Sequence, residues 1–226
     1  MSAIQAWFAQ LQWDNLWGIL ITVSSAVLCI TFHETCHGLM ALWLGDDTAK
    51  RAGRLSLNPL KHIDPIGLVM LAVAKFGWAK PVPVDIRRFR NPKAGMALCA
   101  LAGPLGNVVL CAVCMLFYGV VRYYSYFGSV LHYVELFLWY TIILSAGLAV
   151  FNLLPVPPLD GSKILAVLLP PRWYLKLMRY ERYGMIVLMV LLMTGILDGP
   201  LDTVRDILLT ALTPLALIPF ELLAGI

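Results

Sequence analysis

The residues best suited to chemistry in this sequence form one short motif, His33-Glu34-Thr35-Cys36-His37. On a helix, residues four apart lie on one face and about 6 Å apart along the axis, so His33 and His37 can present their imidazoles to one metal ion. A catalytic zinc typically has three protein ligands and keeps one position for water. Glu34 adjoins the first histidine, where its carboxylate can take a proton from that water. The motif therefore predicts a hydrolytic zinc site with Glu34 as the base.

The surroundings of the motif strengthen this interpretation. It lies in an apolar segment, Leu16 to Leu44, that holds no Lys, Arg or Asp and has Glu34 as its only carboxylate. A single histidine is more often an ordinary core residue, but ionisable groups at membrane depth cost about 2.5 kcal/mol or more and so mark functional positions. Cys36 is rotated about 100° from His37 around the helix axis, which favours packing over coordination.

The composition predicts an integral membrane protein. Of 226 residues, 60% are hydrophobic and 13% are charged, and apolar segments with short loops take up most of the chain. We expect one membrane-embedded domain over residues 1–226, with a catalytic core at about 16–170, C-terminal helices at about 183–224 and no appended soluble domain. The net charge of +4 does not indicate a nucleic-acid partner. The five cysteines all fall in apolar segments, which argues against a disulfide framework.

The distribution of basic residues predicts how the chain is oriented. We expect membrane spans at about 16–44, 94–118 and 134–154. Of the 17 Lys and Arg residues, ten lie between Asp46 and Lys93 and five between Lys163 and Arg182. Because cytoplasmic loops collect Lys and Arg, we expect a multi-pass protein of the cell membrane with an external N-terminus and cytoplasmic basic loops. Segments 183–197 and 207–220 are marginal and predict one or two further C-terminal membrane helices.

The first basic region contains two runs that could be short strands, Ala52 to Leu57 and Lys80 to Val84. They predict a short β-hairpin on the cytoplasmic side. Between them, the apolar stretch 66–74 is too short to span and fits a re-entrant or interfacial piece. His62 and Asp64 in this region are a rival ligand pair, although such a loop pair is more often solvated or turn-forming.

Asp160 is the best candidate for the third metal ligand. It follows a segment whose prolines, at 155, 157 and 158, cannot continue a helix. Unwound backbone at membrane depth occurs where protein or a watery cavity surrounds it. The first and third spans both end on the cytoplasmic side, so Asp160 can lie beside His33 and His37. The competing interpretation is that Asp160 caps a short helix over 161–169. Asn107, on the second span, either makes an interhelical hydrogen bond or faces the cavity as a donor.

Three motifs taken together resemble the site-2 protease family of intramembrane zinc peptidases. They are His33-Glu34-x-x-His37, Gly103-Pro104-x-x-Asn107 and Asn152-x-x-Pro155-x-Pro157-x-Leu159-Asp160-Gly161. Residues 58–65 and 77–84 are similar to the compact prokaryotic branch, which has neither a PDZ nor a CBS domain. The resemblance implies one zinc ion per chain, with ligands His33, His37 and Asp160, and Glu34 as base. It also implies that Asn107 and Asn152 hold substrate or oxyanion.

The resemblance further implies the fold and the activity. We expect an all-α polytopic membrane protein with a three-helix catalytic core that cleaves transmembrane protein substrates within the lipid bilayer. The cleavage would serve regulated intramembrane proteolysis or signal-peptide clearance. A metal transporter would need polar residues along a whole path and often repeated halves, whereas here they cluster at one depth. An inactive scaffold would be expected to have lost Glu34.

Overall fold

The computed structural model describes residues 16–62, 64, 67, 80–125 and 129–225, and within these ranges the chain is helical with irregular connections. No residue in this part belongs to a strand. The helices are α2 (Leu16–Trp43), α3 (Thr48–Arg51), η1 (Pro59–Lys61), η2 (Ile86–Arg88), α5 (Pro92–Ser125), α6 (Ser129–Asn152), α7 (Asp160–Leu168), α8 (Pro171–Thr194), α9 (Asp198–Leu212) and α10 (Pro214–Ala224).

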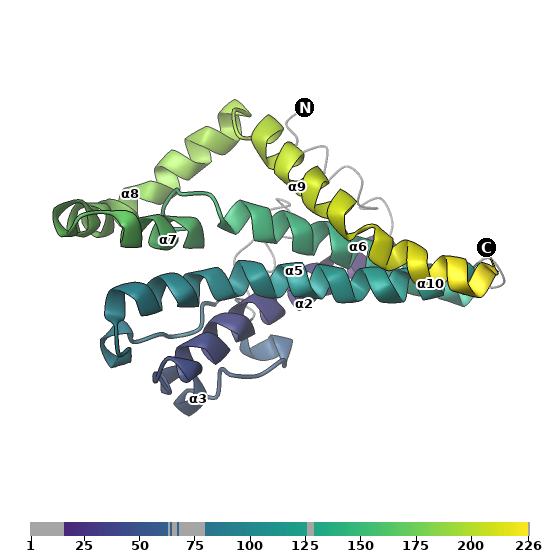
Figure 1. Cartoon of the computed structure of the whole chain (residues 1–226), viewed down its shortest axis with the longest axis horizontal. Helices are drawn as coiled ribbons and strands as arrows, with labels where there is room; N and C mark the ends of the chain where they lie inside the picture. Colours follow the sequence, from purple (N-terminus) through teal and green to yellow (C-terminus); the bar gives the residue numbers. More distant parts are fainter. Residues whose placement is uncertain (1–15, 63, 65–66, 68–79, 126–128, 226) are drawn as a thin grey trace.

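Three long helices, α2, α5 and α6, form the centre of the molecule. Helices α5 and α6 run side by side and α2 packs against both (Figure 1). Their shared core contains small side chains such as Cys29, Cys111 and Ala146. Small residues let helix backbones approach closely where lipid supplies no hydrophobic driving force. Polar contacts add to this packing, since the Ser25 hydroxyl donates to the Phe137 carbonyl at 3.2 Å from one helix to the next.

The C-terminal region, whose structure the sequence left open, forms three helices. Helix α8 ends at Thr194, and the next residue, Gly195, adopts the left-handed conformation (φ 69°) that glycine accepts without strain. Helices α9 and α10 then run back along the central helices (Figure 1). A Cβ atom at Gly119 would collide with the Ala216 carbonyl, so this glycine is what lets α10 lie directly against α5.

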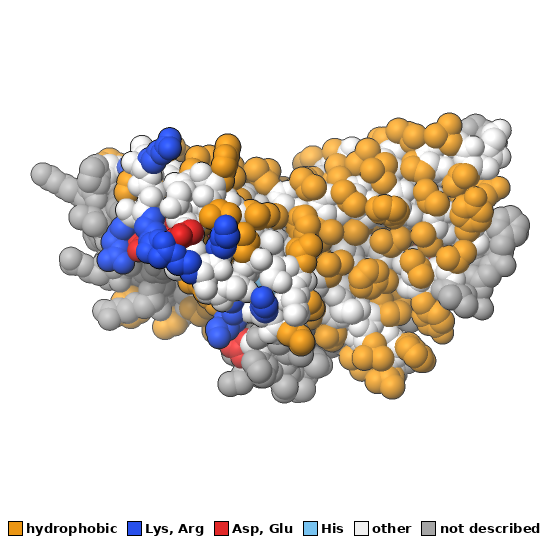
Figure 2. All heavy atoms as spheres, turned by 90° about the horizontal axis from the view of Figure 1, so that it is seen from below, with side chains coloured by type: hydrophobic (Ala, Val, Ile, Leu, Met, Phe, Trp, Pro, Cys, Tyr) orange, Lys and Arg blue, Asp and Glu red, His pale blue; other side chains and the backbone are white. Residues whose placement is uncertain are grey.

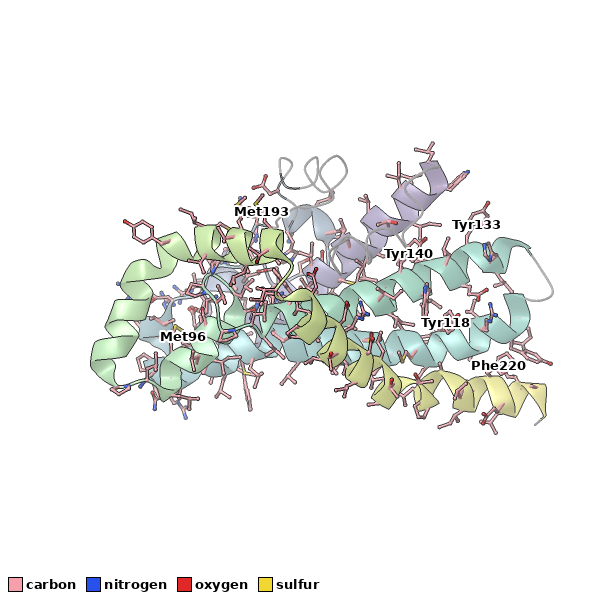
Figure 3. All side chains as sticks on the ribbon, turned by 90° about the horizontal axis from the view of Figure 1, so that it is seen from above. Met96, Tyr118, Tyr133, Tyr140, Met193 and Phe220 are labelled. Carbon is pink, nitrogen blue, oxygen red and sulfur yellow. The ribbon has the colours of Figure 1, made fainter. Side chains whose placement is uncertain are left out.

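The two ends of the molecule differ in polarity. Four helical stretches in the described part are long and apolar enough to cross a membrane: Leu16–Trp43, Pro92–Tyr124, Leu131–Asn152 and Asp198–Ala224. Lys, Arg, Asp and Glu side chains gather at one end of the face in Figure 2, and hydrophobic side chains cover the other. Figure 3 places Met96 toward the end where α7 and α8 meet, and Tyr118, Tyr133 and Phe220 at the opposite end. This amphipathic layout is that of a multi-pass membrane protein.

Two sequence predictions about local structure are corrected. The second and third spans were expected to end near 118 and begin near 134, but α5 continues to Ser125 and α6 begins at Ser129. An ion pair joins Arg122, in the extension of α5, to Glu135 on α6, with Nη1 and Oε1 2.5 Å apart. The extra turns are rich in tyrosine, which is favoured at the membrane interface.

The strands predicted at Ala52–Leu57 and Lys80–Val84 do not form. Pro81 and Pro83 have no N–H groups to donate to a ladder. Side chains connect the two runs instead: Arg54 Nη2 donates to the carbonyls of Lys80 and Pro81 at 2.5 and 3.2 Å. Residues 80–84 are therefore an irregular segment braced by Arg54. The predicted re-entrant piece at 66–74 lies almost entirely outside the described residues.

Candidate metal centre

The three predicted metal ligands meet in the structure although they are up to 127 residues apart in sequence. Asp160 Oδ2 lies 3.2 Å from His33 Nε2 and 3.1 Å from His37 Nε2, and the two Nε2 atoms are 3.0 Å apart. All three side chains are largely buried. Among the described residues, this is the one group of three His, Cys, Asp or Glu side chains placed to share a metal ion.

The local sequence explains how Asp160 reaches the histidines. Helix α7 begins at Asp160 and its N-cap is Leu159, and the Asp160 carboxylate instead faces His33, His37 and Lys163. The capping interpretation is therefore wrong. A Cβ at Gly161 would collide with the carbonyl oxygens of Leu153 and Leu154, so glycine is needed for the chain to fold back after α6. The proline-rich turn and Gly161 together aim the carboxylate at α2.

The triangle of ligand atoms fits a zinc ion. Zinc bonds of roughly 2.0–2.1 Å in a tetrahedral arrangement place neighbouring ligand atoms about 3.3–3.4 Å apart. The observed separations of 3.0, 3.1 and 3.2 Å are close to this spacing. His37 Nδ1 is 2.7 Å from the Cys99 carbonyl, which can only accept, so the neutral ring carries its proton on Nδ1 and turns the Nε2 lone pair toward the triangle.

The contact with Asn107 indicates that His33, like His37, can turn an Nε2 lone pair toward the ligand triangle. Its Nδ2 is 3.3 Å from His33 Nδ1, and its Oδ1 is buried without a hydrogen-bond partner. A histidine that binds zinc through Nε2 carries its proton on Nδ1 and needs an acceptor there. Rotation of the Asn107 amide would bring Oδ1 to that proton and satisfy both groups. The unpaired oxygen is thus accounted for when His33 binds metal.

Gly103 forms the floor under the two imidazoles. A Cβ at this position would lie 2.5 Å from Cε1 and Nε2 of His37 and 2.6 Å from Cε1 of His33. Three residues later, a Cβ at Gly106 would overlap the Cys36 sulfur. Cys36 therefore packs between α2 and α5, as expected. Gly103, on the same face of α5, leaves the space that the two candidate ligand rings occupy.

Glu34 is held by the segment that follows the basic loop. Its Oε2 accepts a hydrogen bond from the Val82 main-chain N–H at 2.8 Å. That segment is anchored by Asp46, which is fully buried and accepts from the Asp85 main-chain N–H at 2.7 Å and from Thr48. Burial alone would raise the pKa of Asp46, but these hydrogen bonds and the nearby Arg88 hold that pKa below its ordinary value. Asp46, just after the end of α2, therefore holds in place the segment whose Val82 N–H orients Glu34.

The candidate ligands open onto a cavity of about 400 Å³. Its walls include Glu34, Val82, Asn152 and Lys163. Asn152 Nδ2 donates to the Leu148 carbonyl at 3.0 Å, within its own helix. Lys163 Nζ lies 3.2 Å from Asp160 Oδ1, and this positive neighbour favours the carboxylate form of Asp160.

The positions of Asn107 and His62 decide between alternatives that the sequence left open. Asn107 could make an interhelical hydrogen bond or face the cavity, and it is fully buried behind His33, with its Nδ2 3.3 Å from His33 Nδ1. The family resemblance implied that Asn107 holds substrate or oxyanion, but it does not line the cavity, whereas Asn152 does. The rival ligand His62 is buried in the loop, where its Nε2 lies 2.7 Å from the Ser56 carbonyl. It joins no metal-binding cluster among the described residues.

Sequence reasoning missed four contributors to the site: the floor at Gly103, the Cys99 carbonyl, the Val82 N–H and Lys163. The Cys99 and Val82 contacts use backbone atoms, which carry no sequence signal. Lys163 stands three residues after Asp160, a spacing that puts both side chains on one helix face, so its contact was detectable in principle.

Comparison with known proteins places the chain in a family. The sequence model of peptidase family M50 matches residues 118–196, a stretch that includes Asn152, Asp160 and Lys163. Three relatives bear the name "Putative zinc metalloprotease". YwhC of Bacillus subtilis is 41% identical over 76% of this chain and 80% of its own length. Rip2 of Mycolicibacterium smegmatis is 31% identical over 79% and 69%. MJ0611 of Methanocaldococcus jannaschii is 31% identical over 65% and 68%.

No solved structure matches this chain. The similarity to these relatives, the motifs and the converging side chains lead to one conclusion: the chain belongs to peptidase family M50, the site-2 protease family, and is a membrane zinc metallopeptidase.

Proposed function

We propose that this enzyme hydrolyses peptide bonds in or next to transmembrane segments of membrane proteins, in regulated intramembrane proteolysis or in signal-peptide clearance. The observation that carries the proposal is the position of the chemistry within the fold. Glu34 and both histidines lie inside α2, a helix of 28 residues that is long and apolar enough to cross a membrane. A substrate that reaches Glu34 must therefore come to membrane depth, which is where a transmembrane segment already lies.

The chemistry of the site favours an unwound substrate. An intact helix holds its carbonyl groups in its own hydrogen bonds, so the carbonyl that is attacked must first leave the helix. The cavity at the ligand triangle, lined by Glu34, Asn152 and Lys163, is where such an unwound peptide would bring its carbonyl. Cleavage then requires local unwinding of the substrate helix.

We propose that His33, His37 and Asp160 hold the zinc and that Glu34 is the catalytic base. When bound, zinc polarises the scissile carbonyl and makes a neighbouring water molecule more acidic. Glu34 takes the proton from that water as its oxygen adds to the carbonyl carbon, and then delivers the proton to the leaving amine nitrogen. The Val82 N–H engages one carboxylate oxygen and so fixes the direction in which the other accepts the proton.

Asn107 and Asn152 receive different roles in this proposal. Asn107 orients His33 by accepting its Nδ1 proton, because it is buried behind the ring at 3.3 Å. Asn152 lines the cavity beside Pro158 and is the amide that can meet a substrate. A substrate that paired with the edge of Pro81 to Val84 could not use the Val82 N–H, which donates to Glu34, and the two prolines have no N–H.

The proposed orientation in the cell membrane follows from the charged end of the molecule. Lys50, Arg51 and Arg54 lie at the end of α2 nearer the site, while Arg122 lies at the other end of α5. The positive-inside rule then puts the site's end in the cytoplasm and the N-terminus outside. We place the whole chain, 1–226, in one membrane-embedded unit.

The test of the proposed function is Glu34→Gln, which removes the base and keeps the size of the side chain and all three proposed ligands. General base catalysis contributes about 10² to 10⁴ in rate. The variant should bind zinc normally. In its membrane proteome, uncut single-span proteins should accumulate that the unaltered enzyme cleaves. Glu221→Gln is the matched control, because Glu221 is an exposed glutamate on α10.

Cleavage by Glu34→Gln at the rate of the unaltered enzyme would refute the assignment of the base. Accumulation of soluble proteins alone would refute the proposed substrate class. Orientation is tested separately with single cysteines at positions 50, 88 and 122, probed in a cysteine-depleted protein in intact cells. An impermeant thiol reagent should reach only position 122, and labelling at 88 would invert the topology.

A further inference from the structure

We propose that Lys163 is a positioning residue that restricts Asp160 to one metal-binding oxygen and thereby keeps a coordination position open for catalysis. The inference rests on the proposed ligand roles of His33, His37 and Asp160. It concerns the contact of Lys163 with Oδ1 of Asp160, the carboxylate oxygen that does not face the histidines.

The two oxygens of Asp160 have separate partners. Oδ2 faces both imidazoles, at 3.2 Å from His33 Nε2 and 3.1 Å from His37 Nε2. Oδ1 instead lies 3.2 Å from Lys163 Nζ. One oxygen of the carboxylate therefore faces the ligand triangle, and the other binds the ammonium group of Lys163. An oxygen that accepts a hydrogen bond from a cation is the weaker competitor for a metal ion on the other side.

The fold makes this division a fixed feature. Asp160 and Lys163 are separated by one turn at the start of α7, where residues three apart share a helix face. The backbone of that turn is held by the contact of Gly161 with the Leu153 and Leu154 carbonyls. The Lys163 side chain is 34% exposed and lines the same cavity as Glu34, so its ammonium group keeps contact with water while it holds Oδ1.

The chemical consequence concerns the coordination number. A carboxylate can bind a metal through one oxygen or through both, and a catalytic zinc with three protein ligands needs its remaining position for water or substrate. If Oδ1 were free to turn toward the metal, Asp160 would supply a second oxygen beside the water, raise the number of ligand atoms from four to five and crowd the position that substrate needs. By holding Oδ1, Lys163 keeps the arrangement with four ligand atoms. Partners of this kind, which orient metal ligands, typically change metal affinity or activity 10- to 100-fold when they are removed.

The experiment uses the full-length enzyme loaded with cobalt(II), whose visible absorption is stronger with four ligands than with five. We expect Lys163→Met and Lys163→Gln to absorb more weakly than the unaltered enzyme, and their zinc-loaded forms to cleave substrate about 10- to 100-fold more slowly. Lys163→Arg keeps a charged donor near Oδ1 and should retain the strong absorption. Lys93→Met is the matched control, because Lys93 Nζ binds the Leu169 carbonyl at the other end of α7 and not Asp160.

The outcomes separate this inference from the proposed function. Unchanged absorption in either Lys163→Met or Lys163→Gln overturns the role of Lys163, even where cleavage slows. Weaker absorption in Lys93→Met as well would also overturn it, because the effect would then be general to α7. The ligand assignment is checked by Asp160→Asn: a spectrum that does not change there refutes Asp160 as a ligand. The absorption measures no cleavage, so it is independent of the substrate class.

Discussion

Replacing Gly103 by alanine would place a methyl group against both proposed histidine ligands. The new Cβ would lie 2.5 Å from Cε1 and Nε2 of His37 and 2.6 Å from Cε1 of His33. Carbon atoms in ordinary contact are about 3.5–4.0 Å apart, so the rings or helix α5 must move by about 1 Å. Neither ring has a free path, because His37 Nδ1 is bound to the Cys99 carbonyl and His33 lies against Asn107.

The expected loss of zinc affinity follows from that displacement. Metal–ligand distances tolerate a change of about ±0.2 Å, which is well below the shift that the methyl group requires. Overpacking a close-packed site costs about 1–3 kcal/mol. If that cost falls on the metal-bound arrangement, the zinc dissociation constant of Gly103→Ala rises roughly 5- to 150-fold, since 1.4 kcal/mol corresponds to a factor of ten.

The assay is competition between the detergent-purified enzyme and a zinc chelator, followed by cleavage at saturating zinc. Gly199→Ala is the control, because a Cβ at Gly199 in helix α9 meets nothing within 4 Å. It should bind zinc and cleave substrate as the unaltered enzyme does. Unchanged zinc affinity and cleavage in Gly103→Ala would refute the reasoning, because α5 would then not form the floor of the site.

Further predictions concern packing, a rejected ligand and acid stability. Gly106→Ala should lower the melting temperature and Cys36→Ala should restore it in the double variant, with a coupling of about 0.5–3 kcal/mol; purely additive effects would contradict their contact. His62→Ala should retain its zinc but lose about 0.5–1.5 kcal/mol of stability, because the Ser56 carbonyl loses one of its two donors and keeps Thr35 Oγ1; zinc loss would revive His62 as a ligand. Asp46 has a lowered pKa in the folded protein, so its stabilisation is present above the ordinary Asp pKa and is lost as the pH falls through the lowered value. Asp46→Asn should therefore be less stable near neutral pH, and unfolding measured across pH should show the difference shrink in acid; a constant difference would contradict the prediction.

The sequence alone determined the chemistry and the membrane character of this protein. His33, Glu34 and His37 are fixed on one helix by their spacing, because a helix repeats every 3.6 residues whatever surrounds it. Apolar runs of sufficient length predicted the first three spans, since each must satisfy its own backbone hydrogen bonds in lipid. The first span was predicted to end near Gly45, and α2 ends at Trp43.

Only the tertiary structure decided how the parts of the site meet. Asp160 was the best ligand candidate in the sequence, with a helix cap as the competing role, and its actual contacts depend on where the turn after α6 directs its side chain. Asn107 could have faced the cavity or made an interhelical hydrogen bond, and it lies behind His33, because the rotation of α5 against α2 is set by the contacts of Gly103 and Gly106. The Val82 N–H and the Cys99 carbonyl are backbone groups, present at nearly every position of any chain. Their selection as partners of Glu34 and His37 is a property of the fold, which no local pattern encodes.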